Sequence, residues 1–258
     1  AEVEAALSAW TSAEGGFGFT TLASQAVDAT GVHAKAGVSG ARPVAAPQVQ
    51  FVRQSPQLGT GHAVQQAEAA LAGFEGDVLI LYGDVPFVRS QTMARMIERL
   101  HGADNPAVVV LAFEPDDALQ YGRVIVEDGR IAKMVEHKDA SEAERACRLC
   151  NSGLMAVRAK DLWSLLARVG NDNAAQEYYL PDIVMIALAD GRPSAVIETA
   201  AWEVAGINSR VELAAVERDW QDRRRLQAMA DGATLIAPET VWFSHDTQLG
   251  RDVVVEPM

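Results

Sequence analysis

From residue 48 onward, short apolar runs alternate along the chain with segments in which apolar residues recur every three or four positions. The short runs are typical of buried β-strands, and the longer spacing is typical of helices with one apolar face. Strands that alternate with helices predict an α/β fold, in which a parallel sheet is flanked by helices. The expected strands are 49–52, 77–82 and 107–113, and the expected helices are 61–71 and 90–100, the second with Ser90 as its N-cap.

After residue 120 the pattern changes. Two alternating apolar runs meet at Asp128-Gly129, a dipeptide typical of the tight turn of a β-hairpin. We therefore expect antiparallel strands to extend the sheet, which makes it mixed. Further expected elements are a strand at 151–157, a helix at 159–169, a helix at 180–191 that Gly191 ends, and a strand at 194–198.

A long helix is expected from about Ser209 to Ala230. Its acidic and basic residues lie three to four positions apart, so we interpret them as a solvated helix face and not as an anion site. In the segment that follows, 232–258, apolar pairs recur about every six residues, which predicts the first coil of a β-helix. One coil cannot bury its own faces, because a stack of about three repeats is needed for stability.

Residues 1–46 do not follow this scheme. They are dominated by alanine, glycine, serine and threonine, and they hold no β-branched run long enough for a central strand. The glycines of "GGFGF" at 15–19 indicate a flexible linker, because no buried strand precedes them and no lysine or arginine is near. The expected division is an atypical low-complexity-like segment at 1–46, the main α/β domain at 47–208, a connecting helix at 209–231 and the β-helix start at 232–258.

The composition is that of a globular protein, with 49% hydrophobic and 22% charged residues among 258. The formal net charge of -13 would repel nucleic acid. No apolar run approaches the roughly 20 residues that cross a bilayer, and the acidic start is unlike a signal peptide, so we expect a cytoplasmic protein without a membrane or nucleic-acid partner. Cys147 and Cys150 are interpreted as two reduced thiols, since a zinc site needs about four ligands.

Two short motifs carry candidate chemistry. "QLGTGHA" at 57–63 places two glycines before an expected helix, and "LYGDVP" at 81–86 ends an apolar run on Asp84. Ligands of open α/β sheets bind outside the carboxyl ends of strands, which is where Asp84 is expected. The residues alone leave simpler alternatives open: a plain loop for the glycines, a turn for Asp84, and a helix N-cap for Asn208 near Ser209.

Taken together, "QLGTGHA", "LYGDVP", "YGR", "EHKDA", "NSGL", "QEYYLPDI" and "GINSR" occur in an order and at spacings that carry a resemblance. From about Gln48 to its end, the chain resembles the uridyltransferase half of the bacterial bifunctional N-acetylglucosamine-1-phosphate uridyltransferase/glucosamine-1-phosphate acetyltransferase family. The resemblance implies a Rossmann-like nucleotidyltransferase domain with a mixed, mostly parallel sheet flanked by helices. It also implies that 232–258 begin a left-handed β-helix.

The resemblance implies that UTP and N-acetylglucosamine-1-phosphate react to give UDP-N-acetylglucosamine and pyrophosphate. It assigns Asp84 and Asn208 to Mg²⁺, a hard cation that prefers oxygen ligands. Glu136 and Asn151 are alternatively a solvated strand residue and a turn residue, and Tyr178 and Tyr179, which could border the acetamido group, are alternatively core aromatics. The implied substrate positions are Gln54, Gln57, Gly59 and Thr60 around the uracil and ribose, Tyr82 and Gly83 along the same cleft, and Gly122, Glu136, Asn151, Tyr179 and Asn208 around the sugar phosphate.

One expected feature of the family is absent from this sequence. Its members carry a glycine-rich loop of the form L-A-A-G-x-G-T-R-M that cradles the triphosphate, and no such motif occurs here. Because triphosphate recognition needs clustered donors and positive charge, we expect UTP to be held poorly and turnover to be impaired. The alternatives are a gene fragment, a non-catalytic sugar-nucleotide binding module, or an assembly subunit. We expect no acetyltransferase activity or coenzyme A site, and the family's homotrimer is doubtful.

Overall fold

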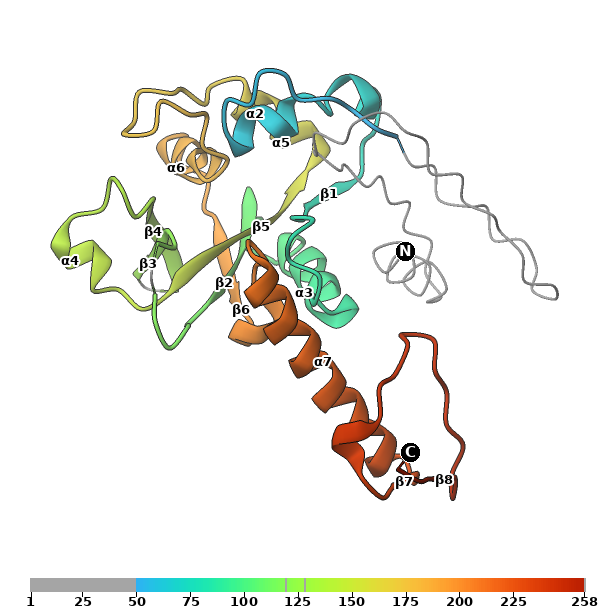
Figure 1. Ribbon diagram of the computed structural model, residues 1–258. Coiled ribbons are helices and arrows are strands. Elements are labelled where there is room, and N and C mark those ends of the chain that lie inside the picture. Colours follow the sequence, from blue (N-terminus) through green and yellow to red (C-terminus); the bar gives the residue numbers. More distant parts are fainter. Residues whose placement is uncertain (1–49, 119, 128, 258) are drawn as a thin grey trace. The chain divides into compact units, whose positions relative to one another are not determined.

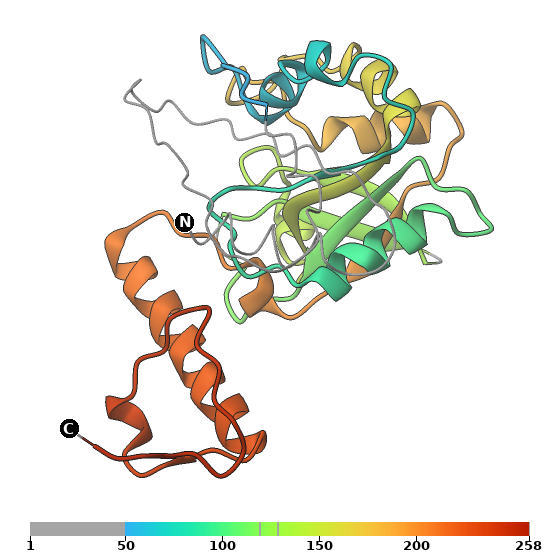
Figure 2. The same ribbon diagram turned by 90° about the vertical axis from the view of Figure 1, so that its right-hand side faces the viewer.

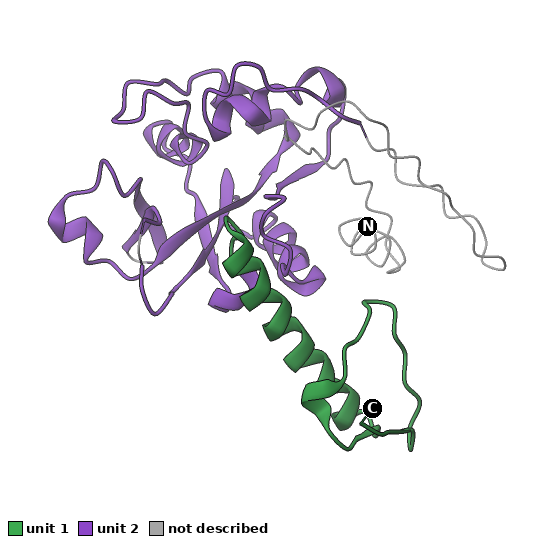
Figure 3. Cartoon of the chain, in the orientation of Figure 1, with its two compact units in different colours: residues 1–5, 205–258 green, residues 6–204 purple. Residues whose placement is uncertain are grey.

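The structure is a computed structural model that describes residues 50–118, 120–127 and 129–257. The predicted atypical segment 1–46 lies outside the described residues. The described chain divides into two compact units, residues 50–204 and residues 205–257, which Figure 3 shows in separate colours. No helix in the described ranges is both long and apolar enough to cross a membrane.

The larger unit is built on one six-stranded sheet. Strand β5 pairs antiparallel with β1, β2 and β3, β4 pairs antiparallel with β3, and β6 pairs parallel with β2. It follows that β1, β2, β3 and β6 run in one direction and only β4 and β5 run against them, so the predicted mixed, mostly parallel sheet is confirmed. The strands are β1 (Asp77–Ile80), β2 (Val108–Phe113), β3 (Arg123–Glu127), β4 (Arg130–Val135), β5 (Cys150–Arg158) and β6 (Ala195–Glu198).

Helices cover both faces of this sheet (Figures 1 and 2). Strand β2 is buried along its whole length, because its even-numbered residues face one core cluster and its odd-numbered residues face the other. Helix α3 packs over the odd-numbered side, and α2, α5 and α6 contribute to the core on the even-numbered side. The helices are α2 (Thr60–Gln65), α3 (Ser90–Leu100), α4 (Glu142–Arg145), α5 (Ala159–Leu166) and α6 (Asp182–Ala189), with short 3₁₀ turns η1 (Ala69–Leu71) and η2 (Ala201–Val204).

Most of the expected elements are present, and three expectations are wrong in detail. The strand expected at 49–52 is not formed at residues 50–52, where Phe51 is 80% exposed. The helix expected at 61–71 is divided into α2 and η1. Ser90 is the first residue of α3 and not its N-cap, because the preceding residue, Arg89, has the extended cap conformation. The hairpin is confirmed, and Gly129 and Gly191 adopt the left-handed conformation expected of a turn and a helix end.

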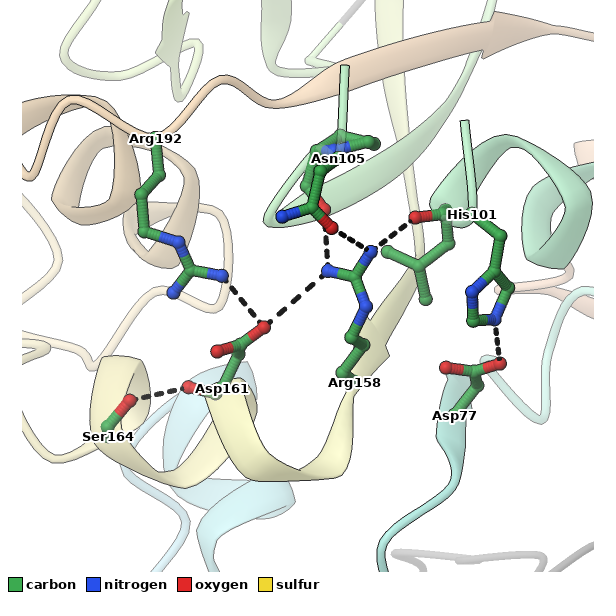
Figure 4. A network of polar contacts seen from close by, with 9 residues as sticks. Asp77, His101, Asn105, Arg158, Asp161, Ser164 and Arg192 are labelled. Atoms are coloured by element: carbon green, nitrogen blue, oxygen red, sulfur yellow. Dashed lines mark hydrogen bonds and ion pairs between the residues drawn. The ribbon is translucent and has the colours of Figure 1, made fainter. Parts of the chain in front are cut away.

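A polar network ties together the amino edge of the strands β1 and β2. Asp77 begins β1 opposite Arg158, the last residue of β5. The guanidinium of Arg158 donates to the carbonyl oxygens of Leu100 and Pro106, at 2.6 and 3.0 Å. Figure 4 shows Asp161 between Arg158 and Arg192. These contacts join loops at the end of the sheet opposite to the carboxyl end of β1, so we interpret the network as structural.

The smaller unit contains helix α7 (Arg210–Ala230), two short strands, β7 (Thr234–Leu235) and β8 (Val254–Val255), and the 3₁₀ turn η3 (Pro238–Thr240). The strands β7 and β8 pair in parallel, as neighbouring coils of a β-helix do. Two arginines of α7 differ from the expected solvated helix face. Arg224 donates to the carbonyl oxygen of Thr247 and Arg225 to that of Val241, each over 2.8 Å, so α7 holds the following loop.

Candidate active site

The glycine motif packs against a distant segment of backbone. The N–H of Gly61 donates to the carbonyl oxygen of Tyr178 over 2.8 Å, and the N–H of Tyr178 donates to the carbonyl oxygen of Leu58 over 2.8 Å. Gly59 has a φ of 106°, and a Cβ atom added there would lie 2.7 Å from the oxygen of Tyr178. The close approach of the two chain segments therefore requires both glycines, independently of any ligand.

The predicted uracil residues differ in how free their side chains are. Nε2 of Gln54 donates to the carbonyl oxygen of Gly59 over 2.9 Å and lies 3.2 Å from Nδ1 of His62. This amide nitrogen therefore already supports the motif, and the amide oxygen is the group that remains for a ligand. Gln57 and Thr60 are exposed. The Thr60 hydroxyl accepts a hydrogen bond from the N–H of Leu180 over 3.0 Å.

Three predicted sugar residues come together where the β3–β4 hairpin meets β5. The N–H of Asn151 donates to the carbonyl oxygen of Gly122 over 2.9 Å. A Cβ atom at Gly122 would lie 3.3 Å from both carboxylate oxygens of Glu136, so the missing side chain leaves room for that carboxylate. Because Arg123 pairs with Cys150, the open end of the hairpin lies at the start of β5, which is the edge where β1 and β2 end.

Tyr82 connects the two halves of the site. Its hydroxyl lies near the side chain of Thr60, and its ring lies against Gly153. Burial raises the pKa of Tyr82 to about 12; the side chain of Thr60 acts in the lowering direction, and the nearby carboxylates of Glu136 and Asp84 act in the raising direction. Residues from the glycine motif, the end of β1 and the hairpin thus surround one phenol, which stays protonated at neutral pH.

Two cavities open at Glu136, with volumes of about 350 and 200 Å³. Both are lined by Glu136 and Tyr179, and the larger one also by Asp139 and Asp182. Burial raises the pKa of Glu136, and the carboxylates of Asp182, Asp139 and Glu177 add to that shift. The surroundings are strongly acidic, so they suit the neutral hydroxyl and amide groups of a sugar better than a phosphate. Asp139 and Asp182 were not predicted, although they lie within the quoted motifs "EHKDA" and "QEYYLPDI".

The predicted metal ligands are both exposed. Asp84 lies in the turn that follows β1, and Gly83 beside it has open space where a side chain would be. Asn208 belongs to the smaller unit and is not the helix N-cap, because the Ser209 hydroxyl accepts from the N–H of Glu212 at 3.1 Å. Among the described residues, no three histidine, cysteine or acidic side chains form a metal cluster. Mg²⁺ commonly takes one or two protein carboxylates and completes its shell with phosphate oxygens and water.

An ion pair that the sequence reasoning missed stabilises the segment after Asp84. Glu203 in η2 is fully buried and accepts hydrogen bonds from Arg89 and Thr92 at the start of α3. Burial acts to raise the pKa of Glu203, but the hydrogen bonds from Arg89, Thr92 and Thr199 outweigh it and leave the pKa below its usual range. The two cysteines are free, as expected, and Cys150 is buried in β5.

The mixed sheet, with candidate ligand residues gathered where β1 and β2 end, defines a Rossmann-like protein of the nucleotidyltransferase class. A sequence model described as MobA-like NTP transferase domain matches residues 19–178, and the chain belongs to this family. Two solved structures share the fold at low identity. An apo UDP-glucose pyrophosphorylase matches with a TM-score of 0.51 and 17% sequence identity. The matched region is 69% of this chain and 66% of the pyrophosphorylase chain. A CMP:2-keto-3-deoxy-manno-octonic acid synthetase has a TM-score of 0.50 and 15% identity, with 69% and 73% covered.

Curated relatives are far more similar in sequence. The Bifunctional protein GlmU of Novosphingobium aromaticivorans is 76% identical over 205 residues, which are 79% of this chain and 46% of that protein. The protein of the same name from Rhizorhabdus wittichii is 66% identical over 238 residues, which are 90% of this chain and 53% of that protein. The chain therefore spans about half the length of the curated relatives it matches.

Proposed function

We propose that this nucleotidyltransferase domain acts on UTP and N-acetylglucosamine-1-phosphate. A phosphate oxygen of the sugar phosphate forms a bond to the α-phosphorus of UTP, and the bond between the α- and β-phosphates breaks, so the products are UDP-N-acetylglucosamine and pyrophosphate. The observation that carries the proposal is the convergence of Tyr82, Glu136 and Asn151 on one cluster from three separate segments. The similarity to proteins named Bifunctional protein GlmU supports the choice of substrates.

The residues bind and orient the substrates. A phosphate nucleophile is already anionic, so no general base is needed and positioning accounts for most of the catalysis. Glu136 accepts hydrogen bonds from sugar hydroxyl groups, and Asn151 and the N–H of Gly122 fix the sugar next to it. Gln54, Gln57, Gly59, Thr60 and Gly83 border the nucleoside, and Tyr179 borders the acetamido group.

Mg²⁺ is the proposed cofactor. Asp84 supplies an exposed carboxylate at the end of β1, and Asn208 is the proposed second protein ligand through its amide oxygen. Both donors are hard oxygens, which suit this cation. When bound, Mg²⁺ would neutralise charge on the phosphates. We place the reaction in the cytoplasm.

A second candidate function is binding of a sugar nucleotide without efficient turnover. The observation that favours it is that no L-A-A-G-x-G-T-R-M motif occurs in this sequence, whereas the proposed sugar residues Gly122, Glu136 and Asn151 lie together. Without the glycine-rich loop, the net negative charge of the chain repels a triphosphate. UDP-N-acetylglucosamine can still bind to Glu136, Asn151 and Tyr82. For the chain as printed, we therefore expect slow uridyl transfer together with measurable binding of the product.

Release of pyrophosphate from UTP, Mg²⁺ and N-acetylglucosamine-1-phosphate tests the activity, and calorimetry with UDP-N-acetylglucosamine tests binding. We expect weak turnover that EDTA and Asp84→Asn abolish, while the exposed control Asp116→Asn leaves it unchanged. Heat of binding without turnover would favour the binding module. If the protein shows no turnover and also gives no heat of binding at high ligand concentration, both proposed functions are contradicted.

A further inference from the structure

Strand β5 is irregular at its centre. Its pairing with β2 shifts between Val110 and Ala112, and within the irregular stretch Gly153 adopts a φ of 83°, a conformation that residues with a side chain rarely take. The hydroxyl of Ser152 donates to the carbonyl oxygen of Leu111 over 2.6 Å and so fixes the bulge to β2. Bulges next to active sites commonly redirect side chains, and two predicted ligand residues lie at this one.

The first is Tyr82, whose ring occupies the space that a side chain at Gly153 would fill. A Cβ atom there would lie 2.3, 2.7 and 2.9 Å from Cε2, Cζ and the hydroxyl oxygen of Tyr82. Real Cβ atoms do not approach other heavy atoms so closely, so an alanine would displace the phenol. The place of Tyr82 between Thr60, Glu136 and Asp84 therefore depends on a glycine in another strand.

The second is Asn151, which lies two residues before the glycine. Its carboxamide oxygen accepts a hydrogen bond from the N–H of Gly153 over 2.9 Å. This bond fixes the orientation of the carboxamide and leaves its Nδ2 group as the donor side. One residue thus controls the orientation of two side chains through two different atoms, its absent Cβ and its backbone N–H.

We propose that Gly153 is a positioning residue of the sugar-nucleotide site, which holds the Tyr82 hydroxyl and the Asn151 amide nitrogen as a pair of hydrogen-bond donors. The phenol of Tyr82 keeps its proton at neutral pH, so its hydroxyl can donate a hydrogen bond to a ligand. The ligand atoms that meet this pair are acceptors, such as sugar or phosphate oxygens. The identity of the ligand rests on the proposed function, but the positioning does not.

A ligand-independent experiment tests the positioning. The chain has four tyrosines, so the protein labelled with 3-fluorotyrosine gives four ¹⁹F resonances, and Tyr82→Phe identifies that of Tyr82. We expect Gly153→Ala to shift the Tyr82 resonance and to leave those of Tyr178 and Tyr179 in place. Gly191→Ala is the matched control, because Gly191 has a similar φ of 72° with nothing near its missing Cβ. An unshifted Tyr82 signal in folded Gly153→Ala protein would overturn the proposal.

Calorimetry with UDP-N-acetylglucosamine tests the consequence for binding. We expect Gly153→Ala to weaken affinity about tenfold, the effect of losing a good hydrogen bond, and Gly191→Ala to leave it unchanged. In a Tyr82→Ala background, Gly153→Ala should weaken binding by less than threefold, because the clash is gone. If the wild-type chain binds nothing, the proposed function fails while the ¹⁹F result still decides the positioning.

A variant that does not fold remains informative. If Gly153→Ala alone is unfolded, the double variant with Tyr82→Ala should recover a cooperative thermal transition, since the nearest atoms to the added methyl group all belong to Tyr82. Failure of Tyr82→Ala to recover folding would show that the glycine serves the strand and not the tyrosine, which contradicts the proposal.

Discussion

The side chain of Arg89 donates two hydrogen bonds to one carboxylate oxygen of Glu203, with Nε and Nη2 at 2.9 and 2.5 Å. Arg89 lies five residues after Asp84 and is half exposed, whereas Glu203 is fully buried in η2. The pair joins the start of α3 to a segment more than a hundred residues later in the chain. A buried carboxylate in such a position stabilises the fold only while its partners remain.

Glu203→Gln should lower the free energy of unfolding by about 1–3 kcal/mol at neutral pH, because a neutral amide replaces the acceptor of four hydrogen bonds from Arg89 and Thr92. The pKa of Glu203 is lowered in the folded protein, so the stability it contributes is present above its unfolded pKa and is lost as pH falls through the folded value. Urea unfolding at pH 7 and at low pH measures this. The difference should shrink in acid, and the exposed control Glu198→Gln should show little effect at either pH.

Glu136→Gln should raise the stability of the folded protein at neutral pH, whereas Glu203→Gln should lower it. The folded pKa of Glu136 is raised, so protonation favours the folded state and its charge at neutral pH costs stability. We expect the glutamine variant to melt at a higher temperature at pH 7, with a gain that vanishes as pH falls below about 4, the range of an unfolded glutamate. The same variant should bind UDP-N-acetylglucosamine more weakly, because the proposed function makes this carboxylate an acceptor of hydrogen bonds from the sugar.

Glu144 is the matched comparison for Glu136. The side-chain contact with Lys133, followed by the capping contacts with Ser141, lowers the pKa of Glu144 to about 2. Its stabilising contribution is present above its unfolded pKa and is lost as pH falls toward 2, so Glu144→Gln should lower the melting temperature at neutral pH and converge with the wild type in strong acid. If the melting temperatures of Glu136→Gln and Glu144→Gln change in the same direction at pH 7, the proposed destabilising charge of Glu136 is contradicted.

Gly59→Ala should destabilise the chain by about 2–4 kcal/mol, from left-handed strain plus overlap with the backbone of Tyr178. Gly73→Ala is the control for the strain alone, because Gly73 has a φ of 78° and open space around its missing Cβ. It should cost about 1 kcal/mol. Chemical denaturation of the two variants compares them, and equal losses would show that contact with Tyr178 is unimportant.

Gln221→Leu should loosen the loop after β7 in the smaller unit. The buried amide of Gln221 donates to the carbonyl oxygen of Phe243 and accepts from its N–H, at 2.9 and 2.8 Å. A leucine leaves both backbone groups without these partners, at a cost of about 2–4 kcal/mol. Hydrogen exchange at the Phe243 amide should accelerate at least tenfold, while the exposed control Gln227→Leu should leave it unchanged.

Much of this protein follows from local sequence pattern. The continuous apolar run at 107–113 predicted the buried strand β2, and apolar residues three or four positions apart predicted α3 and α6. Asp128-Gly129 predicted the hairpin because few residues tolerate a tight turn. The strand expected at 49–52 is not formed at residues 50–52, where no described strand pairs with the apolar run. The helix expected at 61–71 is divided into α2 and η1 because tertiary packing, and not helix propensity alone, determines where a helix ends.

The class of fold, the order of the elements and the motifs that carry the candidate chemistry can all be predicted from the sequence, because they depend on spacing along the chain. Three relationships became visible in the folded chain alone: Gly59 faces Tyr178, Asp139 and Asp182 lie around Glu136, and Gly153 makes room for Tyr82. Each of those relationships joins residues far apart in the chain, or a residue to the empty space beside it. Contacts of this kind depend on how the strands and loops pack, so the spacing of residues along the sequence does not predict them.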